Sequence, residues 1–196
     1  MAVSFNKNGI VNASGNEIGK NLIIDSLNKT VSHLESGNEY IPIDLGQSYM
    51  DVPSGTTITI SFDLEIKYVT QSTYFQVYNT NNKGPKQITG KNIGSQVFGG
   101  AAVGDTIKKR VSLTTTIVDR DSPTATKNYM EFYSTYNTGN VFKVSNLKME
   151  LGSTATPWIP NESDWGYTGN TFAFIESGDK MSVYPNHIQT PEFIEY

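Results

Sequence analysis

Two short segments of this sequence place a polar residue between two tyrosines, with a spacing that would put all three on one face of a β-strand. Alternate residues of a strand point to the same face. Aromatic rings can stack on the apolar faces of neutral sugars. Amides can donate hydrogen bonds to sugar hydroxyls or accept them, and carboxylates accept them. We therefore predict a saccharide-binding face formed by Tyr74, Gln76, Tyr78, Tyr129, Glu131 and Tyr133.

The same pattern also has an explanation that needs no ligand. Tyrosines commonly pack against one another across neighbouring strands, and a sheet face can lie beneath a loop. Two strands that each carry a tyrosine, a polar residue and a second tyrosine are a more specific arrangement than one exposed aromatic residue. The sequence leaves both explanations open.

The acidic residues and histidines give little support for catalysis. A glycosidase needs two carboxylates on either side of a cleft, roughly 5–10 Å apart. Asp63 and Glu65 are two residues apart in one predicted strand, which separates them by about 7 Å, but any such pair on a solvated strand has this spacing. His33 and His187 each stand alone in polar sequence. We therefore predict that the protein is not an enzyme.

Loop aspartates offer oxygen atoms that could bind calcium. The candidates are Asp105, Asp119 and Asp121, but the sequence contains no D-x-D-x-D-G loop. The absence of cysteine excludes a disulfide framework and a cysteine metal site. We predict no cofactor, with a structural calcium ion as an open alternative.

The composition favours an all-β protein with a polar, uncharged surface. Its 196 residues include 11 tyrosines, 9 phenylalanines and 17 glycines, and only 17% are charged. A net charge of −4 argues against nucleic acid as a partner, because phosphates call for a basic surface. No apolar run approaches the roughly 20 residues that span a bilayer, and the start MAVSFNKNG lacks the features of a secretory signal. We therefore predict neither membrane insertion nor a signal peptide.

Alternating apolar residues predict a series of short strands. Residues 56–70 alternate without interruption from Ile58 to Tyr68, which is typical of a strand with one buried face. Residues 79–106 are rich in asparagine and glycine and form a long excursion, which we expect Phe98 to anchor. Further strands are predicted at 21–25, 39–45, 72–79, 106–119 and 129–136.

A closing strand is predicted after the turn at residues 137–140. Its alternating residues are Leu147, Met149 and Leu151 on the buried face, and Lys148 and Glu150 on the other. Because the inward positions change parity before Leu147, we expect a β-bulge near Ser145 and Asn146. Gly152, Pro157 and Pro160 then end the strand.

These elements predict an all-β jelly roll or β-sandwich with two appendages. Residues 21–163 form the sandwich. Residues 1–20 form an N-terminal arm, which is either a loose segment or a short docking strand. Residues 164–196 form a C-terminal β-hairpin tail, whose two strands flank a turn at Gly178 and Asp179. A hairpin of that size is marginal alone and must pack on the sandwich or on another chain.

Three motifs in the sandwich carry a family resemblance. They are NLIID at 21–25, PSGTTITISFD at 53–63 and SNLKMELGSTATPW at 145–158. They resemble the carbohydrate-binding-module-like jelly-roll domains of bacteriophage tail and baseplate proteins. Ile58 departs from the pattern, because that position usually holds an aromatic residue in this family. Trp158, between two prolines, is expected to plug the edge of the sandwich rather than to bind ligand.

The resemblance implies a non-catalytic virion component of the phage tail, made in the host cytoplasm. It would adhere to a polysaccharide on the host cell surface and associate with other phage tail proteins, as a homo-oligomer. The alternative is a structural adaptor that holds a multimeric tail assembly together without binding sugar. The arm and the hairpin would then be the functional parts, and the sandwich only a scaffold.

Overall fold

The computed structural model describes residues 3–6, 9–12, 17–33, 41–44, 50–79, 84–124, 129–134, 138–161, 164, 173–177 and 180–184. Their regular structure is almost entirely antiparallel β-sheet, which confirms the predicted all-β sandwich. One sheet has the order β4 (Val31–His33), β12 (Val141–Leu151), β6 (Thr57–Lys67), β10 (Thr106–Asp119) and β8 (Lys86–Ile88). The second has the order β5 (Ile41–Asp44), β11 (Tyr129–Ser134), β7 (Phe75–Asn79) and β9 (Lys91–Asn92).

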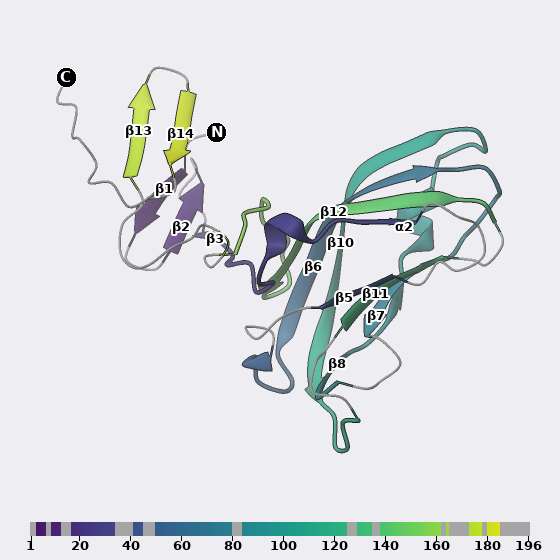
Figure 1. The fold of residues 1–196 in the computed structure, drawn as a ribbon, viewed down its shortest axis with the longest axis horizontal. Coiled ribbons are helices and arrows are strands. Elements are labelled where there is room, and N and C mark those ends of the chain that lie inside the picture. The colour runs from purple at the N-terminus through teal and green to yellow at the C-terminus, as the bar shows by residue number, and fades with distance from the viewer. Residues whose placement is uncertain are drawn as a thin grey trace.

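The two sheets enclose one hydrophobic core. The long strands β6, β10 and β12 bend along their length, and β5, β7 and β11 lie within the bend (Figure 1). Four phenylalanines join the sheets. Phe62 of β6 meets Phe132 of β11 edge-on, with ring centroids 4.9 Å apart. Phe75 of β7 meets Phe142 of β12 in the same way at 5.3 Å. Each of these rings has at most 1% of its surface exposed, so the aromatic cluster is the centre of the core.

The alternation read from the sequence places the inward residues of β6 correctly. All six alternating residues from Ile58 to Tyr68 are buried, and β10 begins and ends at the predicted residues. The predicted bulge is also present, because the pairing of β12 with β6 shifts register between Ser145 and Lys148. Asn146 lies within this bulge and has a left-handed backbone conformation, with φ 49°.

The excursion between β7 and β10 carries short elements of its own. It contains β8, β9 and the helix α2 (Gly94–Phe98), which the sequence did not predict. As expected, Phe98 anchors it, stacking on Tyr68 with ring centroids 5.0 Å apart. Gly94 lies so close to the residues that precede β7 that an added Cβ would be 1.9 Å from the carbonyl oxygen of Thr73. Glycine is therefore required where the helix meets the sheet.

The prediction of a strand at residues 21–25 is wrong. These residues run along the edge of β12 and are buried at Asn21, Leu22 and Ile23, but they form no ladder. The Leu22 amide donates to Met149 O, and the Asn21 side chain makes four further hydrogen bonds. Its Oδ1 accepts from the Met149 and Ile23 amides, and its Nδ2 donates to two carbonyls, those of Leu147 and Ile159. One buried amide side chain thus replaces the backbone pairing of a strand.

The closing strand is buried on both faces, which also differs from the prediction. Lys148 and Glu150 have 0% and 1% of their surface exposed, whereas Leu151 is 59% exposed. The reason is the segment that follows, residues 152–161, which we call the strap. It folds back over the outer face of β12 and β6, where Thr59 donates a hydrogen bond to Gly152 O. The strap thus covers the face of β12 that was predicted to be exposed to solvent, and the polar side chains of that face are buried.

Thr156 connects the strap to the buried charges. Its hydroxyl donates to Glu150 Oε2 at 2.5 Å and accepts from Lys148 Nζ at 2.5 Å and from the Gly19 amide at 3.0 Å. Lys148 and Glu150 form an ion pair of 3.2 Å. Burial lowers the pKa of Lys148 from its usual value, although the neighbouring Glu150 carboxylate favours the charged form.

Side chains also join the two segments through which the chain enters and leaves the sandwich. The Asp164 carboxylate accepts hydrogen bonds from the amide and hydroxyl of Ser26, at the start of the short 3-10 helix η1 (Ser26–Asn28). The Asn161 side chain donates to Asn21 O. These contacts, with the Gly19–Thr156 bond, hold both segments against β12.

The terminal residues form small sheets of their own. Strands β1 (Val3–Asn6), β2 (Gly9–Asn12) and β3 (Glu17–Ile18) make a three-stranded antiparallel sheet rather than a loose arm. Strands β13 (Ala173–Ser177) and β14 (Lys180–Tyr184) pair as the predicted C-terminal hairpin. The side chains of these strands, and Trp165, lie outside the described residues.

We predict that Thr156→Val destabilises the protein by about 2–4 kcal/mol, because it removes three hydrogen bonds and leaves two buried charges short of partners. Thr154→Val is the matched control. Thr154 is an exposed residue of the same strap, and its replacement should change stability by no more than about 0.5 kcal/mol. Urea denaturation of the two variants measures the difference. Equal stabilities would contradict the role assigned to Thr156.

Candidate ligand-binding face

The two strands that carry the tyrosine pattern are neighbours in the four-stranded sheet. Strands β7 and β11 pair antiparallel, with Gln76 opposite Tyr133 and Tyr78 opposite Glu131. Residues directly opposite in a sheet point to the same face. The register therefore brings both predicted sets onto one surface, in which aromatic and polar positions alternate across the strands. The side chains of Tyr78 and Tyr129 lie outside the described residues.

The Tyr74 side chain contacts two other side chains of this face, those of Tyr133 and Gln76. The rings of Tyr74 and Tyr133 meet edge-to-face, with centroids 5.4 Å apart and an interplanar angle of 87°. The Tyr74 hydroxyl donates a hydrogen bond to Gln76 Oε1. All three residues are partly exposed, and partial burial raises the pKa of the Tyr74 phenol. We refer to Tyr74, Gln76, Glu131 and Tyr133 as the tyrosine face.

Glu131 occupies an unusual environment within the tyrosine face. The sequence predicted an outward-pointing carboxylate available to ligand, but the side chain is fully buried, at 0% exposure. Within the described part of the chain, no donor reaches either of its carboxylate oxygens. It lies between Pro42 of β5 and Tyr78 of β7 in the register of the sheet. The other buried carboxylate, Glu150, is fully engaged by Lys148 and Thr156.

The contacts of the tyrosine face fit both explanations that the sequence left open. Edge-to-face packing and the tyrosine–glutamine bond are ordinary cross-strand contacts. They also hold the rings and the amide in fixed positions, and such preorganisation reduces the entropy lost on ligand binding. The structure establishes the grouping of the residues, and binding remains a prediction.

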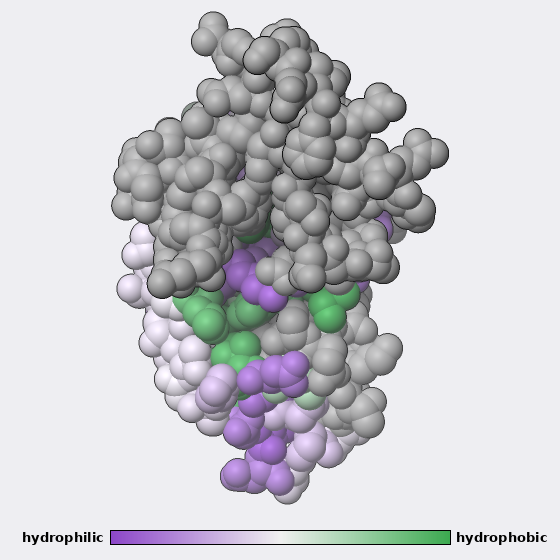
Figure 2. Space-filling view, turned by 90° about the vertical axis from the view of Figure 1, so that its left-hand side faces the viewer, coloured by the Kyte–Doolittle hydropathy of each residue, from purple (hydrophilic) through white to green (hydrophobic). Residues whose placement is uncertain are grey.

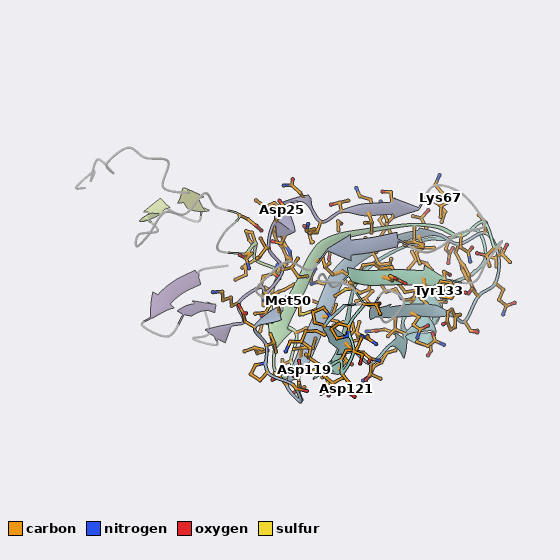
Figure 3. The ribbon with its side chains drawn as sticks, turned by 60° about the horizontal axis from the view of Figure 1, so that its bottom comes forward. Asp25, Met50, Lys67, Asp119, Asp121 and Tyr133 are labelled. Atoms are coloured by element: carbon orange, nitrogen blue, oxygen red, sulfur yellow. The ribbon has the colours of Figure 1, made fainter. Side chains whose placement is uncertain are left out.

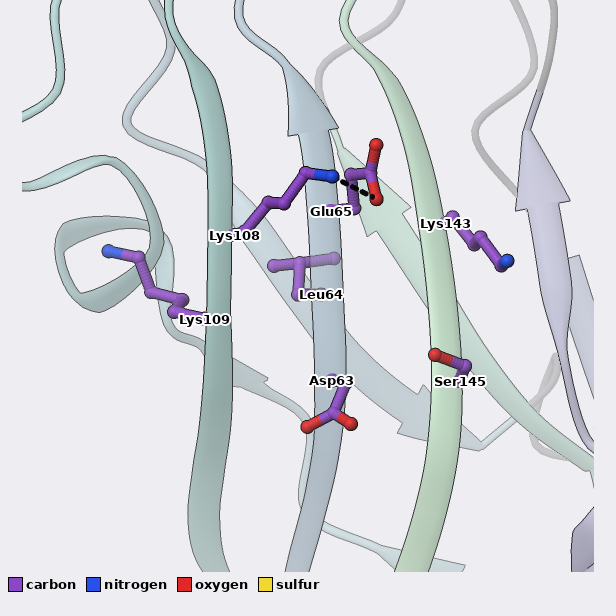
Figure 4. A pocket seen from close by; sticks show the side chains of 7 residues that line it. All are labelled: Asp63, Leu64, Glu65, Lys108, Lys109, Lys143 and Ser145. Atoms are coloured by element: carbon purple, nitrogen blue, oxygen red, sulfur yellow. Dashed lines mark ion pairs between the residues drawn. The ribbon is translucent and has the colours of Figure 1, made fainter.

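The pair of carboxylates weighed for catalysis lies on the outer face of the other sheet. Asp63 forms an ion pair with Arg110 at 2.9 Å and accepts a hydrogen bond from Asn146 at 2.7 Å. Glu65 pairs with Lys108 at 3.2 Å (Figure 4). With Lys109, Lys143 and Ser145 they line a depression of about 350 Å³. Both carboxylates are thus partners in surface ion pairs.

The three aspartates considered as calcium ligands do not come together. Asp105 precedes β10 and Asp119 ends it. The 14 residues of that strand place roughly 45 Å of extended chain between them. Asp119 and Asp121 lie at one end of the sandwich, and Tyr133 and Lys67 lie toward the other (Figure 3). Asp119 is engaged by Lys86 at 2.6 Å. The set cannot form one metal site.

The remaining candidates from the sequence contribute little to a site. The side chain of His33 and all of His187 lie outside the described residues. Trp158 is partly buried, and its indole donates to Leu147 O at 3.2 Å, so it fixes the strap on β12. On the side of the molecule shown in Figure 2, the described surface is mostly pale, with small separate hydrophobic and hydrophilic patches. No helix in the described part of the chain is long and apolar enough to cross a bilayer.

One depression was not anticipated from the sequence. It holds about 300 Å³ and is lined by Thr57, Thr89, Lys91, Thr114, Thr115 and Thr116. Thr57 lies opposite Thr116, and Thr59 lies opposite Thr114. The repeated threonines at alternate positions of β6 and β10 are the feature of the sequence from which this depression could have been predicted. Their hydroxyls serve local contacts, such as that of Thr114 with Ser153 O, so the depression is weaker than the tyrosine face as a candidate site.

We predict that Tyr74 and Tyr133 stabilise the sheet jointly. In a double-mutant cycle with Tyr74→Leu and Tyr133→Leu, the coupling energy should be about 0.5–1.5 kcal/mol, because the ring pair is lost in either single variant. The control cycle combines Tyr74→Leu with Leu151→Ala, on the other sheet, and should be additive to within about 0.5 kcal/mol. Thermal and urea unfolding provide the free energies. Additivity in the first cycle would mean that the ring contact contributes nothing.

Comparison with known proteins shows a similarity at the level of a solved structure. No protein family matches this sequence, and no curated protein matches it. Among solved structures, the chain is similar to one in the tripod (BppUct-A-L) from the baseplate of bacteriophage Tuc2009. The match has 19% identity and a TM-score of 0.44, and it covers 74% of this chain and 60% of that chain. The match thus spans less than two thirds of the length of that neighbour.

Proposed function

We propose that this protein is a non-catalytic component of a bacteriophage tail or baseplate, and that it adheres to a neutral saccharide of the host surface. The assignment to a phage tail is supported by the resemblance of the NLIID, PSGTTITISFD and SNLKMELGSTATPW motifs to jelly-roll domains of such proteins. The binding role is supported by one observation, the register that gathers Tyr74, Gln76, Glu131 and Tyr133 on one sheet face.

The tyrosine face has the chemistry that sugars require. A phenol ring offers an apolar surface for the CH groups of a pyranose, and its hydroxyl offers a hydrogen bond at the rim. Gln76 can both donate and accept, and Glu131, when ionised, accepts only. Neither Lys nor Arg belongs to this set, so it provides no positive charge for an anionic polymer. The set therefore suits an uncharged, hydroxyl-rich ligand.

The ion pairs of Asp63 and Glu65, on the outer face of the other sheet, agree with a non-catalytic role. A glycosidase needs one carboxyl group as an acid and another as a base or nucleophile. Asp63 and Glu65 are instead held in ion pairs with Arg110 and Lys108. A phage adhesion module needs only to hold the surface polysaccharide, with the affinity of each copy raised by multivalency in the assembled tail.

We predict that Tyr133→Ala weakens binding to a panel of immobilised bacterial cell-wall polysaccharides by about tenfold or more, as expected for loss of a central aromatic contact. Tyr78→Ala should act in the same direction. Leu151→Ala, at an exposed residue of the other sheet, is the control and should bind like the unmodified protein. Biolayer interferometry on folded variants measures the effect. Unchanged affinity in both tyrosine variants would rule out this face as the site.

The structural adaptor is the second candidate, and the terminal sheets favour it. The three-stranded N-terminal sheet and the two-stranded C-terminal hairpin form no ladder with the sandwich in the described residues. A two-stranded hairpin is marginal by itself in water. Such elements gain stability by packing on a partner, which in a tail assembly is a second copy or another tail protein. The contacts of Ser26 with Asp164 and of Asn21 with Asn161 would then fix the appendages to the sandwich.

We predict that deletion of residues 165–196 abolishes concentration-dependent self-association of the chain, while the sandwich stays folded. Light scattering after size-exclusion chromatography measures the oligomer, and circular dichroism reports the fold. The variant Lys180→Ala/Met181→Ala, within β14, tests the hairpin without shortening the chain. Retention of the oligomer after the deletion would exclude the hairpin as an assembly element.

A further inference from the structure

Within the described part of the chain, Glu131 is a buried carboxyl group for which the fold supplies no hydrogen-bond partner. Its side chain is fully buried, and neither carboxylate oxygen receives a hydrogen bond from the described residues. Buried carboxylates normally occur with a cation or with several donors, because removing the charge from water costs far more than packing returns. Glu150 shows this pattern in the same protein, with Lys148, the Thr156 amide and the Thr156 hydroxyl around it.

The position of Glu131 connects it to the tyrosine face. It stands two residues from Tyr133 on β11, and residues so spaced lie on the same face, about 7 Å apart. Gln76, opposite Tyr133, is its diagonal neighbour on β7. The carboxylate therefore adjoins two partly exposed side chains, Tyr133 and Gln76, that are candidates for contact with ligand.

The hydrogen-bonding capacity of the face is asymmetric. The oxygen Oε1 of Gln76 accepts a hydrogen bond from the Tyr74 hydroxyl. The amide nitrogen of Gln76 is the group that can donate a hydrogen bond to a ligand. Glu131 offers two acceptor oxygens and no donor when ionised. A carboxylate binds two adjacent hydroxyls of a sugar ring in a bidentate manner, and charge-assisted bonds of this kind are about twice as strong as neutral ones.

We propose that Glu131 determines the specificity of the tyrosine face, by accepting hydrogen bonds from adjacent hydroxyls of an uncharged sugar and by repelling acidic saccharides. This inference rests on the proposed saccharide-binding function and adds the class of ligand. Since Glu131 is fully buried, the sugar reaches it only after neighbouring side chains move aside. Binding therefore includes a conformational step.

The test compares Glu131→Gln with Glu65→Gln on an array of defined oligosaccharides. The array carries uncharged glucose, galactose and N-acetylglucosamine oligomers, together with galacturonate oligomers and their neutral methyl esters. Glu65, an exposed carboxylate of the other sheet, provides the matched control. We expect the unmodified protein to bind uncharged probes only. Glu131→Gln should lose about 10- to 100-fold in affinity for the best uncharged probe, and Glu65→Gln should lose nothing.

A stability measurement separates this role from a structural one. Replacing an unpartnered buried carboxylate by a neutral amide should leave the melting temperature unchanged or raise it. A marked fall would show that Glu131 has a structural partner and would overturn the inference. So would unchanged affinity in Glu131→Gln alongside a loss in Tyr133→Ala, a result that leaves the saccharide-binding function standing. Absence of binding to every probe by the unmodified protein would instead count against that function itself.

Discussion

Lys148 and Glu150 lie 3.2 Å apart beneath the strap, and neither side chain is exposed to solvent. A buried ion pair repays its desolvation only when further hydrogen bonds complete it. Thr156 supplies these bonds through its hydroxyl and its amide, and Pro157 O accepts another from Lys148. The strap must therefore close over β12 for the charges to be tolerated. Burial of this pair is the constraint on which the closing half of the sandwich depends.

This constraint gives a physical meaning to the SNLKMELGSTATPW motif. Asn146 adopts the left-handed bulge, Lys148 and Glu150 form the buried pair, Thr156 bridges it, and Trp158 bonds to Leu147 O. Every polar residue named has a structural partner, so the motif marks how the domain closes rather than where it binds. Among the described residues, the buried carboxylate without a hydrogen-bond partner lies on the opposite sheet, at Glu131, which is why the functional proposals concern that sheet.

The sequence predicted which side chains of the tyrosine face point outward from their strands, but it did not predict that Glu131 is buried. Period-two alternation placed Tyr74, Gln76, Glu131 and Tyr133 on the outward side of their strands, because parity along a strand is a local property. Pairing of β7 with β11 was needed to bring the two sets together, and it depends on long-range topology. The burial of Glu131 depends on what covers the sheet, and no pattern within residues 129–136 contains that information.

The sequence by itself determined the all-β class, the inward residues of β6, the bounds of β10, the bulge in β12 and the C-terminal hairpin. Alternation and turn residues act within a few positions of the chain, so these features are readable locally. Only the tertiary structure decided that residues 21–25 form no strand and that Lys148 and Glu150 are interior. The Asn21 side chain takes the hydrogen bonds of a ladder, and the strap covers the outer face of β12. The first result depends on contacts between Asn21 and β12, which are more than a hundred residues apart in the sequence. The second depends on the reversal of the chain after β12. In each case a polar residue is buried because another segment supplies its hydrogen-bond partners.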